Sequence, residues 1–201
     1  MIALKILEQS DKKLTFTIDT DVGFANALRR VMMNEVPVLA VEQVIFEDNN
    51  SGLFDEVVAH RLGLLPLAFD QKSMGKKSEC KCGGKGCSRC EVRLTLEKQG
   101  PAMVLSDDLV CDGVVPEKGV PIVELLDNQR IKLEAVAQLG VGTDHTKFQS
   151  AIVGYSEGKT GFTFSVESVC GLSARAVLES ALDVLEERTE SFLKEFKKAT
   201  K

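Results

Sequence analysis

Residues 55–67 read DEVVAHRLGLLPL. After this stretch, the spacing of apolar residues changes from that of a helix to that of strands. The stretch predicts a helix from about Asp55 to Leu62. Gly63 is its natural C-terminal stop, because glycine readily adopts the left-handed conformation that ends helices. A strand from Val38 to Phe46 is expected before this helix. After it, alternating polar and apolar residues predict strands at 91–97, 131–136 and 161–167, so the middle of the chain is expected to be mostly β.

The N-terminal part of the chain predicts a hairpin followed by a helix. Residues 2–7 and 13–18 have strand patterns, and a polar turn separates them. Thr20 or Asp21 can cap the helix, which ends at Pro37 because the residue before a proline avoids the helical region. One face of the helix carries the apolar residues Phe24, Leu28 and Val31. Beside this face lies an arginine pair, Arg29 and Arg30.

A long helix is predicted from Ser173 to Lys198. Its apolar residues follow three- and four-residue steps, at Leu178, Leu182, Leu185, Phe192 and Phe196. More apolar residues widen this stripe beyond what a helix lying on its own domain needs, namely Val177, Ala181, Val184 and Leu193. We expect a partner helix to cover the surplus. A long helix wrapped by its own sheet is the alternative.

Residues 80–90 read CKCGGKGCSRC, which places four of the six cysteines in one glycine-rich loop. Thiols one or two residues apart can chelate one ion, and the glycines let the backbone fold around it. Four sulfurs without a nearby histidine leave no open coordination position. We therefore expect a closed, structural Zn²⁺ site, with an iron–sulfur cluster as the second choice and disulfides or free thiols as the metal-free alternatives. The expected ligands are Cys80, Cys82, Cys87 and Cys90.

The composition is that of an ordinary soluble protein of one or two domains, with 201 residues, 44% of them hydrophobic and 27% charged. No apolar run approaches the ~18 residues needed to span a bilayer. Charged residues already break up the N-terminal apolar run, at Lys5, Glu8 and Asp11. We therefore expect neither a signal peptide nor a membrane segment, and a cytoplasmic location.

The net charge of −5 argues against a protein that holds nucleic acid over its whole surface. The stretch from Lys72 to Arg93 is the exception, with seven basic residues against two acidic ones. It would face phosphate or an acidic protein patch, or simply keep an exposed loop soluble. No aromatic residue lies among the lysines to stack on bases.

No catalytic pattern is present in the sequence. The two histidines, His60 and His145, have no imidazole or serine and aspartate partner at motif spacing. Residues 140–144, GVGTD, lack the lysine and hydroxyl that complete a P-loop and predict a turn. We expect no catalytic residues, so the chemistry favours a binding or assembly module.

Three segments occur in order along the first third of the chain: residues 26–30 (NALRR), Val36-Pro37 and residues 55–67. They resemble the signature of the alpha-type subunits of cellular RNA polymerases. The cysteine loop and residues 121–126 (PIVELL) and 140–148 (GVGTDHTKF) are most similar to the archaeal members of this family, the D subunits. These are relatives of the third-largest subunit of eukaryotic polymerase II and of the bacterial alpha N-terminal domain. The resemblance runs over nearly the whole chain.

The resemblance implies an α+β fold with a discontinuous alpha-type dimerisation domain, residues 1–40 and 150–201. A β-rich insert domain, residues 41–149, would carry the metal loop. It also implies a noncatalytic subunit of DNA-directed RNA polymerase that supports transcription. Such a chain would pair with the small subunit L, dock the large catalytic subunit beside other small assembly subunits, and reach nucleic acid only through the complex. The expected interface residues are Phe24, Leu28, Arg29, Arg30, Val31, Leu178, Leu182, Leu185, Phe192 and Phe196.

Two departures from this family matter. Many archaeal D subunits carry a ferredoxin-like domain with iron–sulfur clusters after the segment that matches residues 152–155. Here only residues 156–160 lead to the next strand, so we expect that domain and its clusters to be absent; Cys111 and Cys170 alone would not hold a cluster. Position 148 is Phe where the family usually has Trp, which preserves packing but loses an N–H donor.

Two other functions compete with the polymerase interpretation. The first is a free-standing zinc module that binds nucleic acid or an acidic protein through the stretch from Lys72 to Arg93. The second, weaker one is an unrecognised metalloenzyme, which would lose turnover on chelation.

Overall fold

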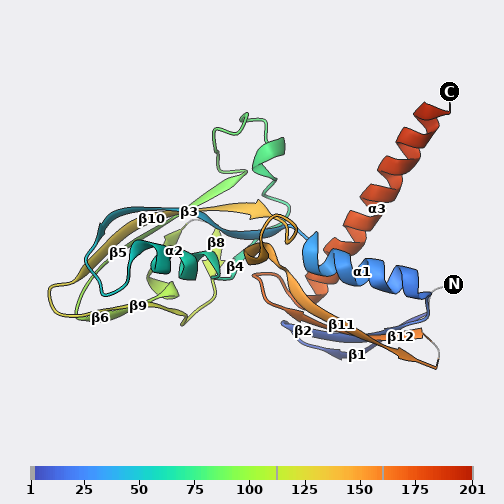
Figure 1. The fold of residues 1–201 in the computed structure, drawn as a ribbon, viewed down its shortest axis with the longest axis horizontal. Coiled ribbons are helices and arrows are strands. Elements are labelled where there is room, and N and C mark those ends of the chain that lie inside the picture. Colours follow the sequence, from blue (N-terminus) through green and yellow to red (C-terminus); the bar gives the residue numbers. More distant parts are fainter. Residues whose placement is uncertain (1–2, 112, 160, 201) are drawn as a thin grey trace. The chain divides into compact units, whose positions relative to one another are not determined.

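The structure is a computed structural model that describes residues 3–111, 113–159 and 161–200. Ile2 and Thr160, which belong to segments considered above, lie outside the described residues. The chain forms two compact units. Unit 1 consists of Met1–Pro37 and Val141–Lys201, and unit 2 of Val38–Gly140. Both combine helices with antiparallel sheets, and most of the regular structure is β (Figure 1).

Unit 1 contains a four-stranded antiparallel sheet in the order β1-β2-β12-β11. The expected N-terminal hairpin is confirmed, and β2 also pairs with β12 from the far end of the chain. Phe16 and Phe164 lie opposite each other in this pairing, and their rings stack with centroids 5.1 Å apart. The strands are β1 (Leu4–Gln9), β2 (Lys13–Ile18), β11 (Ala151–Gly158) and β12 (Gly161–Ser168).

Two helices, α1 (Val22–Asn34) and α3 (Ala174–Ala199), pack on each other and on this sheet (Figure 1). The α1 cap is Asp21, whose carboxylate accepts a hydrogen bond of 3.0 Å from the Phe24 N–H. Ser173 caps α3 in the same way, through a bond of 3.1 Å from the Ala176 N–H. Both caps satisfy N–H groups that have no partner within the helix.

Unit 2 is built on a four-stranded antiparallel sheet in the order β3-β10-β5-β7. Two smaller strand pairs, β4 with β8 and β6 with β9, and the helix α2 (Asp55–Gly63) complete it. The long strands are β3 (Val38–Asn49), β5 (Glu91–Gln99) and β10 (Arg130–Gly140), and the short ones β4 (Leu67–Phe69), β6 (Ala102–Leu105), β7 (Val110–Cys111), β8 (Val114–Pro116) and β9 (Pro121–Leu125). Three short 3₁₀ helices are η1 (Lys77–Glu79), η2 (Ser106–Asp108) and, in unit 1, η3 (Thr146–Phe148).

The strands β3 and β10 run further than their sequence patterns predict. They pair along nearly their whole length with two register shifts. Each shift interrupts the alternation of inward and outward side chains by which a strand is recognised in the sequence. The boundary between the units also falls earlier than expected, after Gly140 rather than after residue 149. The segment after Gly140 belongs to unit 1 because it bonds to α1: the Thr143 N–H donates to the Asn34 carbonyl at 3.0 Å.

Candidate metal centre and helical interface

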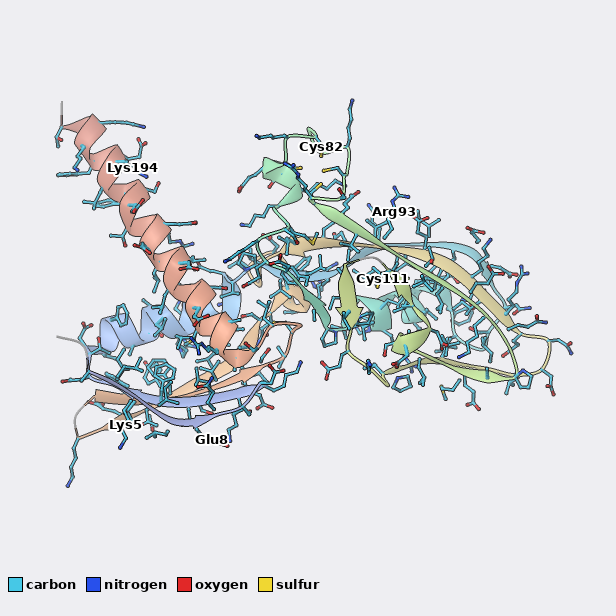
Figure 2. The ribbon with its side chains drawn as sticks, turned by 180° about the vertical axis from the view of Figure 1, so that it is seen from behind. Lys5, Glu8, Cys82, Arg93, Cys111 and Lys194 are labelled. Atoms are coloured by element: carbon cyan, nitrogen blue, oxygen red, sulfur yellow. The ribbon has the colours of Figure 1, made fainter. Side chains whose placement is uncertain are left out.

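The four cysteines of residues 80–90 bring their sulfurs together at the end of the loop between β4 and β5 (Figure 2). All four Sγ atoms lie within 4.8 Å of one another, and none is in a disulfide. Three pairs have Sγ–Sγ distances of 3.6, 3.7 and 3.8 Å: Cys80–Cys87, Cys82–Cys90 and Cys87–Cys90. Sulfurs bound tetrahedrally at ~2.3 Å to one Zn²⁺ stand about 3.8 Å apart. The residues present therefore fit a single tetrahedral ion.

Glycine makes the tight course of this loop possible. Gly83, Gly84 and Gly86 have φ angles of +64°, +80° and +88°, which strain any residue with a Cβ. Backbone bonds then close the second half of the loop, where the Cys90 N–H donates to the Cys87 carbonyl at 2.9 Å. The Cys87 N–H points at the Cys90 sulfur, 3.4 Å away. The backbone thus holds the thiols together and directs an N–H toward a sulfur.

The thiols differ in acidity. A hydrogen bond from the Cys80 thiol, helped by N–H groups of Gly86 and Gly84, lowers the pKa of Cys82 to about 7. Burial raises the pKa of Cys90 to about 12. A thiol must lose its proton to bind a metal. Binding of an ion by Cys82 and Cys90 therefore requires both thiols to lose their protons.

The basic residues around the loop divide into two groups. Lys77 pairs with Glu91, and Arg93 pairs with Glu134 at 2.6 Å, so these charges are matched within unit 2. The remaining residues of the loop itself are exposed, namely Lys81, Lys85 and Arg89. Three of the seven basic residues of the stretch therefore lie exposed among the cysteines, while Lys72 and Lys76 precede them.

The helix α3 is buried at its beginning and exposed at its end. Val177 and Ala181 lie in the core of unit 1, while Leu178 and Leu185 are half-buried. Leu182 is exposed, and every residue from 186 to 200 is exposed. Phe192 and Phe196 are 69% and 57% exposed, and their rings stack on each other with centroids 6.3 Å apart. Figure 1 shows this half of α3 continuing beyond α1.

The apolar face of α1 was expected to belong to a partner interface, but most of it is buried within unit 1. Leu28 and Val31, placed in the interface by the sequence, are 1% and 3% exposed and lie inside the core of unit 1. They are packing residues of this chain, because α3 and the sheet already cover that face of α1. Phe24 is only half-buried and retains some accessible ring surface.

The arginine pair lies on the outside of α1. The Arg29 guanidinium donates to the Asn26 side-chain oxygen at 3.0 Å and points at the Met33 sulfur. Arg30 is exposed. Neither arginine pairs with a carboxylate in the part of the chain that the structure describes.

Comparison with known proteins identifies the family. Residues 43–154 match the RNA polymerase Rpb3/RpoA insert domain. A relative from Methanocaldococcus jannaschii, named DNA-directed RNA polymerase subunit Rpo3, is 36% identical over 187 residues, which cover 92% of this chain and 90% of the relative. The chain belongs to the Rpb3/RpoA family of RNA polymerase subunits.

Other Rpo3 relatives of this Rpb3/RpoA chain are longer. Those from Archaeoglobus fulgidus and Methanothermobacter thermautotrophicus are 40% and 46% identical over 157 residues, covering 76% and 74% of this chain. The matches cover 60% and 58% of these two relatives. The chain thus spans about three fifths of the length of these relatives.

The Rpb3/RpoA chain also exposes apolar residues that sequence reasoning missed. Leu4 and Ile6 on β1 are about half exposed, although they lie opposite the buried residues Ile18 and Phe16. They therefore continue the core face of the sheet to its edge. The alternating sequence of β1 predicts which of its side chains lie on the apolar face. It does not predict whether another element covers them, because β1 is the edge strand of the sheet.

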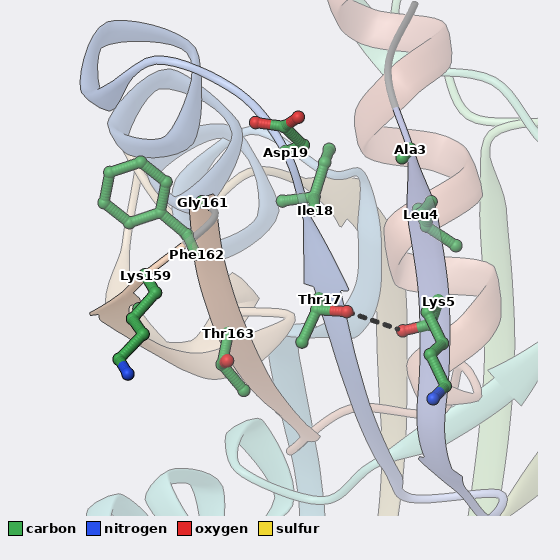
Figure 3. A pocket seen from close by; sticks show the side chains of 11 residues that line it. Ala3, Leu4, Lys5, Thr17, Ile18, Asp19, Lys159, Gly161, Phe162 and Thr163 are labelled. Atoms are coloured by element: carbon green, nitrogen blue, oxygen red, sulfur yellow. Dashed lines mark hydrogen bonds between the residues drawn. The ribbon is translucent and has the colours of Figure 1, made fainter.

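A depression of about 480 Å³ lies beside this edge, at the ends of β1, β2 and β12 (Figure 3). Among its lining residues, the charged side chains are Lys5, Asp19 and Lys159. The Thr17 hydroxyl in the lining donates to the Lys5 carbonyl at 3.4 Å. Among the described lining residues, no nucleophile is paired with a base, so we assign the depression no chemistry. Across the described ranges, no helix has the length and apolar character needed to cross a membrane.

Proposed function

We propose that this chain is the noncatalytic assembly platform of a DNA-directed RNA polymerase and works in the cytoplasm. It pairs with the small subunit L and docks the large catalytic subunit. The observation that carries this proposal is the exposed apolar surface of α3, with Leu182 in its first half and Phe192 and Phe196 in its second half open to solvent. The names of the Rpo3 relatives and the match to the insert domain support it.

The energetics of α3 support a partner. Burying a large apolar side chain contributes ~1.5–3 kcal/mol, and an isolated helical segment this short is marginal in water. The exposed segment therefore gains most of its stability from a neighbouring helix. Half-exposed Leu4 and Ile6 on β1 offer further apolar surface within the same unit.

We assign a single structural Zn²⁺ to the sulfurs of Cys80, Cys82, Cys87 and Cys90. Four sulfurs within 4.8 Å of one another surround the volume of one ion, which favours Zn²⁺ over a cluster of several irons. The ion supplies cross-links that fix the loop. The assignment predicts about one equivalent of zinc per chain by elemental analysis, and lower occupancy in Cys82→Ser, with pairing to subunit L retained.

Co-expression with subunit L tests the assembly proposal. Native mass spectrometry is expected to find a one-to-one heterodimer that carries one metal ion. The chain made alone is expected to self-associate, because its apolar helix end lacks a cover. A soluble monomer that does not bind subunit L, and that binds nucleic acid in a salt-sensitive way, would favour the alternative of a free-standing zinc module.

A further inference from the structure

Glu91 links three parts of unit 2 around the cysteine loop. It follows Cys90 directly and begins β5, and its side chain is only 11% exposed. Its carboxylate accepts a hydrogen bond from the Lys77 ammonium on η1, before the cysteines. It also accepts from the Gln138 amide at 3.3 Å, and Gln138 lies opposite it in the ladder between β10 and β5.

The same carboxylate lies against the backbone of the loop. A Cβ placed on Gly86 would come within 1.9 Å of one Glu91 carboxylate oxygen. Gly86 stands next to the ligand Cys87, and its N–H lies close enough to the Cys82 sulfur to lower that thiol's pKa. The position of the Glu91 carboxylate is therefore coupled to the path of the backbone between two ligands.

Lys77 adds a charge to this arrangement. The hydrogen bond with Glu91 raises the pKa of Lys77. Four thiolates around Zn²⁺ leave a net charge of −2. An ammonium held beside them offsets part of that charge, and Glu91 holds the ammonium there.

We infer that Glu91 is a positioning residue for the metal centre, an inference that rests on the zinc assignment proposed above. Its carboxylate, anchored to the sheet through Gln138, fixes Gly86 and Lys77 so that the four sulfurs converge before the ion arrives. A loop that is ordered in advance loses less conformational entropy on binding. Removing the carboxylate therefore weakens zinc binding without removing a ligand.

Chelator competition for Zn²⁺ tests this inference. In Glu91→Ala the affinity is expected to fall about tenfold or more, as is typical for groups that orient metal ligands, with a smaller loss in Glu91→Gln. Glu97→Ala is the matched control, because it removes the same charge from an exposed position on β5. The absorption of bound Co²⁺ is expected to stay that of four thiolates in every variant. Equal zinc affinity in Glu91→Ala and Glu97→Ala overturns the inference.

A glycine pair separates the carboxylate contact from backbone strain. Gly84 and Gly86 have similar positive φ angles, but a Cβ on Gly84 would meet nothing within 4 Å. Gly86→Ala is therefore expected to weaken zinc binding more than Gly84→Ala. Adding Glu91→Ala to Gly86→Ala is expected to cost less than the two separate losses, because the collision is gone. Equal losses in the two glycine variants, or full additivity, count against the inference.

Pairing with subunit L, measured on the same variants, separates this inference from the assembly proposal. A wild-type chain that pairs with L but binds no zinc overturns the metal assignment and the role of Glu91, and leaves the assembly proposal intact. A chain that binds zinc in a Glu91-dependent way but does not bind subunit L supports the role of Glu91 and overturns the assembly proposal.

Discussion

α1 and α3 carry the same kind of apolar stripe but use it differently. The stripe of α1 lies in the core of unit 1, where Leu28 is 1% exposed. The stripe of α3 is buried only in its first half, and ends in the exposed pair Phe192 and Phe196. Periodicity reports that a face is apolar, and the tertiary structure decides whether this chain covers it.

Length explains the difference. With a rise of 1.5 Å per residue, the 13 residues of α1 extend about 20 Å and the 26 residues of α3 about 39 Å. The helix α3 is twice as long as the helix beside it, so most of its second half extends past α1, and the described contact between them there is the ion pair of Arg188 with Glu35. A helix that continues its stripe past its own core indicates a surface for another chain.

The first prediction concerns Leu28, and it has the largest expected effect. Leu28→Ala is expected to lower the free energy of unfolding by ~2–5 kcal/mol, because it leaves a cavity in a closed core. The same truncation on α3, Leu193→Ala, is expected to change it by no more than about 0.5 kcal/mol, since Leu193 is 48% exposed. Urea unfolding measures both, at a chain concentration low enough for the isolated chain to remain monomeric. Equal losses of stability in the two variants would mean that Leu28 and Leu193 are buried to the same extent, which would contradict the comparison.

Much of unit 1 could be predicted from local sequence. The hairpin followed from alternation, the start of α1 from Asp21, and the extent of α3 from its spacing. In unit 2 the strands β4, β7 and β8 have two or three residues each, which is too short for a period of two to be recognised. Strand β9 hides its pattern because neighbouring residues Ile122 and Val123 are both buried.

The candidate site was predictable where its residues are neighbours in sequence. The four cysteines lie within one loop, so their spacing alone indicated a common ion. Gln138 is 47 residues from Glu91 and meets it only through the pairing of β5 with β10. The burial of Leu28 and Val31 was likewise beyond the sequence, since it depends on α3 arriving from the other end of the chain.

The second prediction tests the exposed half of the comparison. Leu182→Asp is expected to weaken pairing with subunit L by about 2 kcal/mol or more, roughly thirtyfold, because it places a charge within an apolar seam. Ser191→Asp adds the same charge to an exposed position at the margin of the stripe, outside its five central residues, and is expected to weaken pairing much less. Titration of labelled subunit L measures both affinities. Normal pairing by Leu182→Asp would refute the assembly proposal.

The third prediction concerns the outer face of α1, whose inner face is already used by the core. Arg30→Ala is expected to weaken recruitment of the large catalytic subunit about tenfold, because an exposed guanidinium is available for a carboxylate of another chain. Arg29→Ala is expected to do less, since that guanidinium is partly bound to Asn26. The pair with subunit L serves as the control and stays intact. Normal reconstitution by both variants would make the arginines surface residues without this role.

The fourth and smallest effect is expected at Arg188, which lies at the start of the exposed half of α3. Its guanidinium pairs with Glu35, the C-cap of α1. The Arg188 side chain is 62% exposed, so the pair is screened by water and salt. Arg188→Ala is expected to lower the free energy of unfolding by less than about 1 kcal/mol, with the difference shrinking at high salt.

Urea unfolding of Arg188→Ala at low and high salt checks this, with Arg188→Lys as the variant that keeps the charge. A loss as large as that of Leu28→Ala would mean that unit 1 itself holds the beginning of the exposed half through this ion pair. The surface left for subunit L would then begin further along α3, at Phe192 and Phe196, and Leu182 would contribute less to pairing than the second prediction requires.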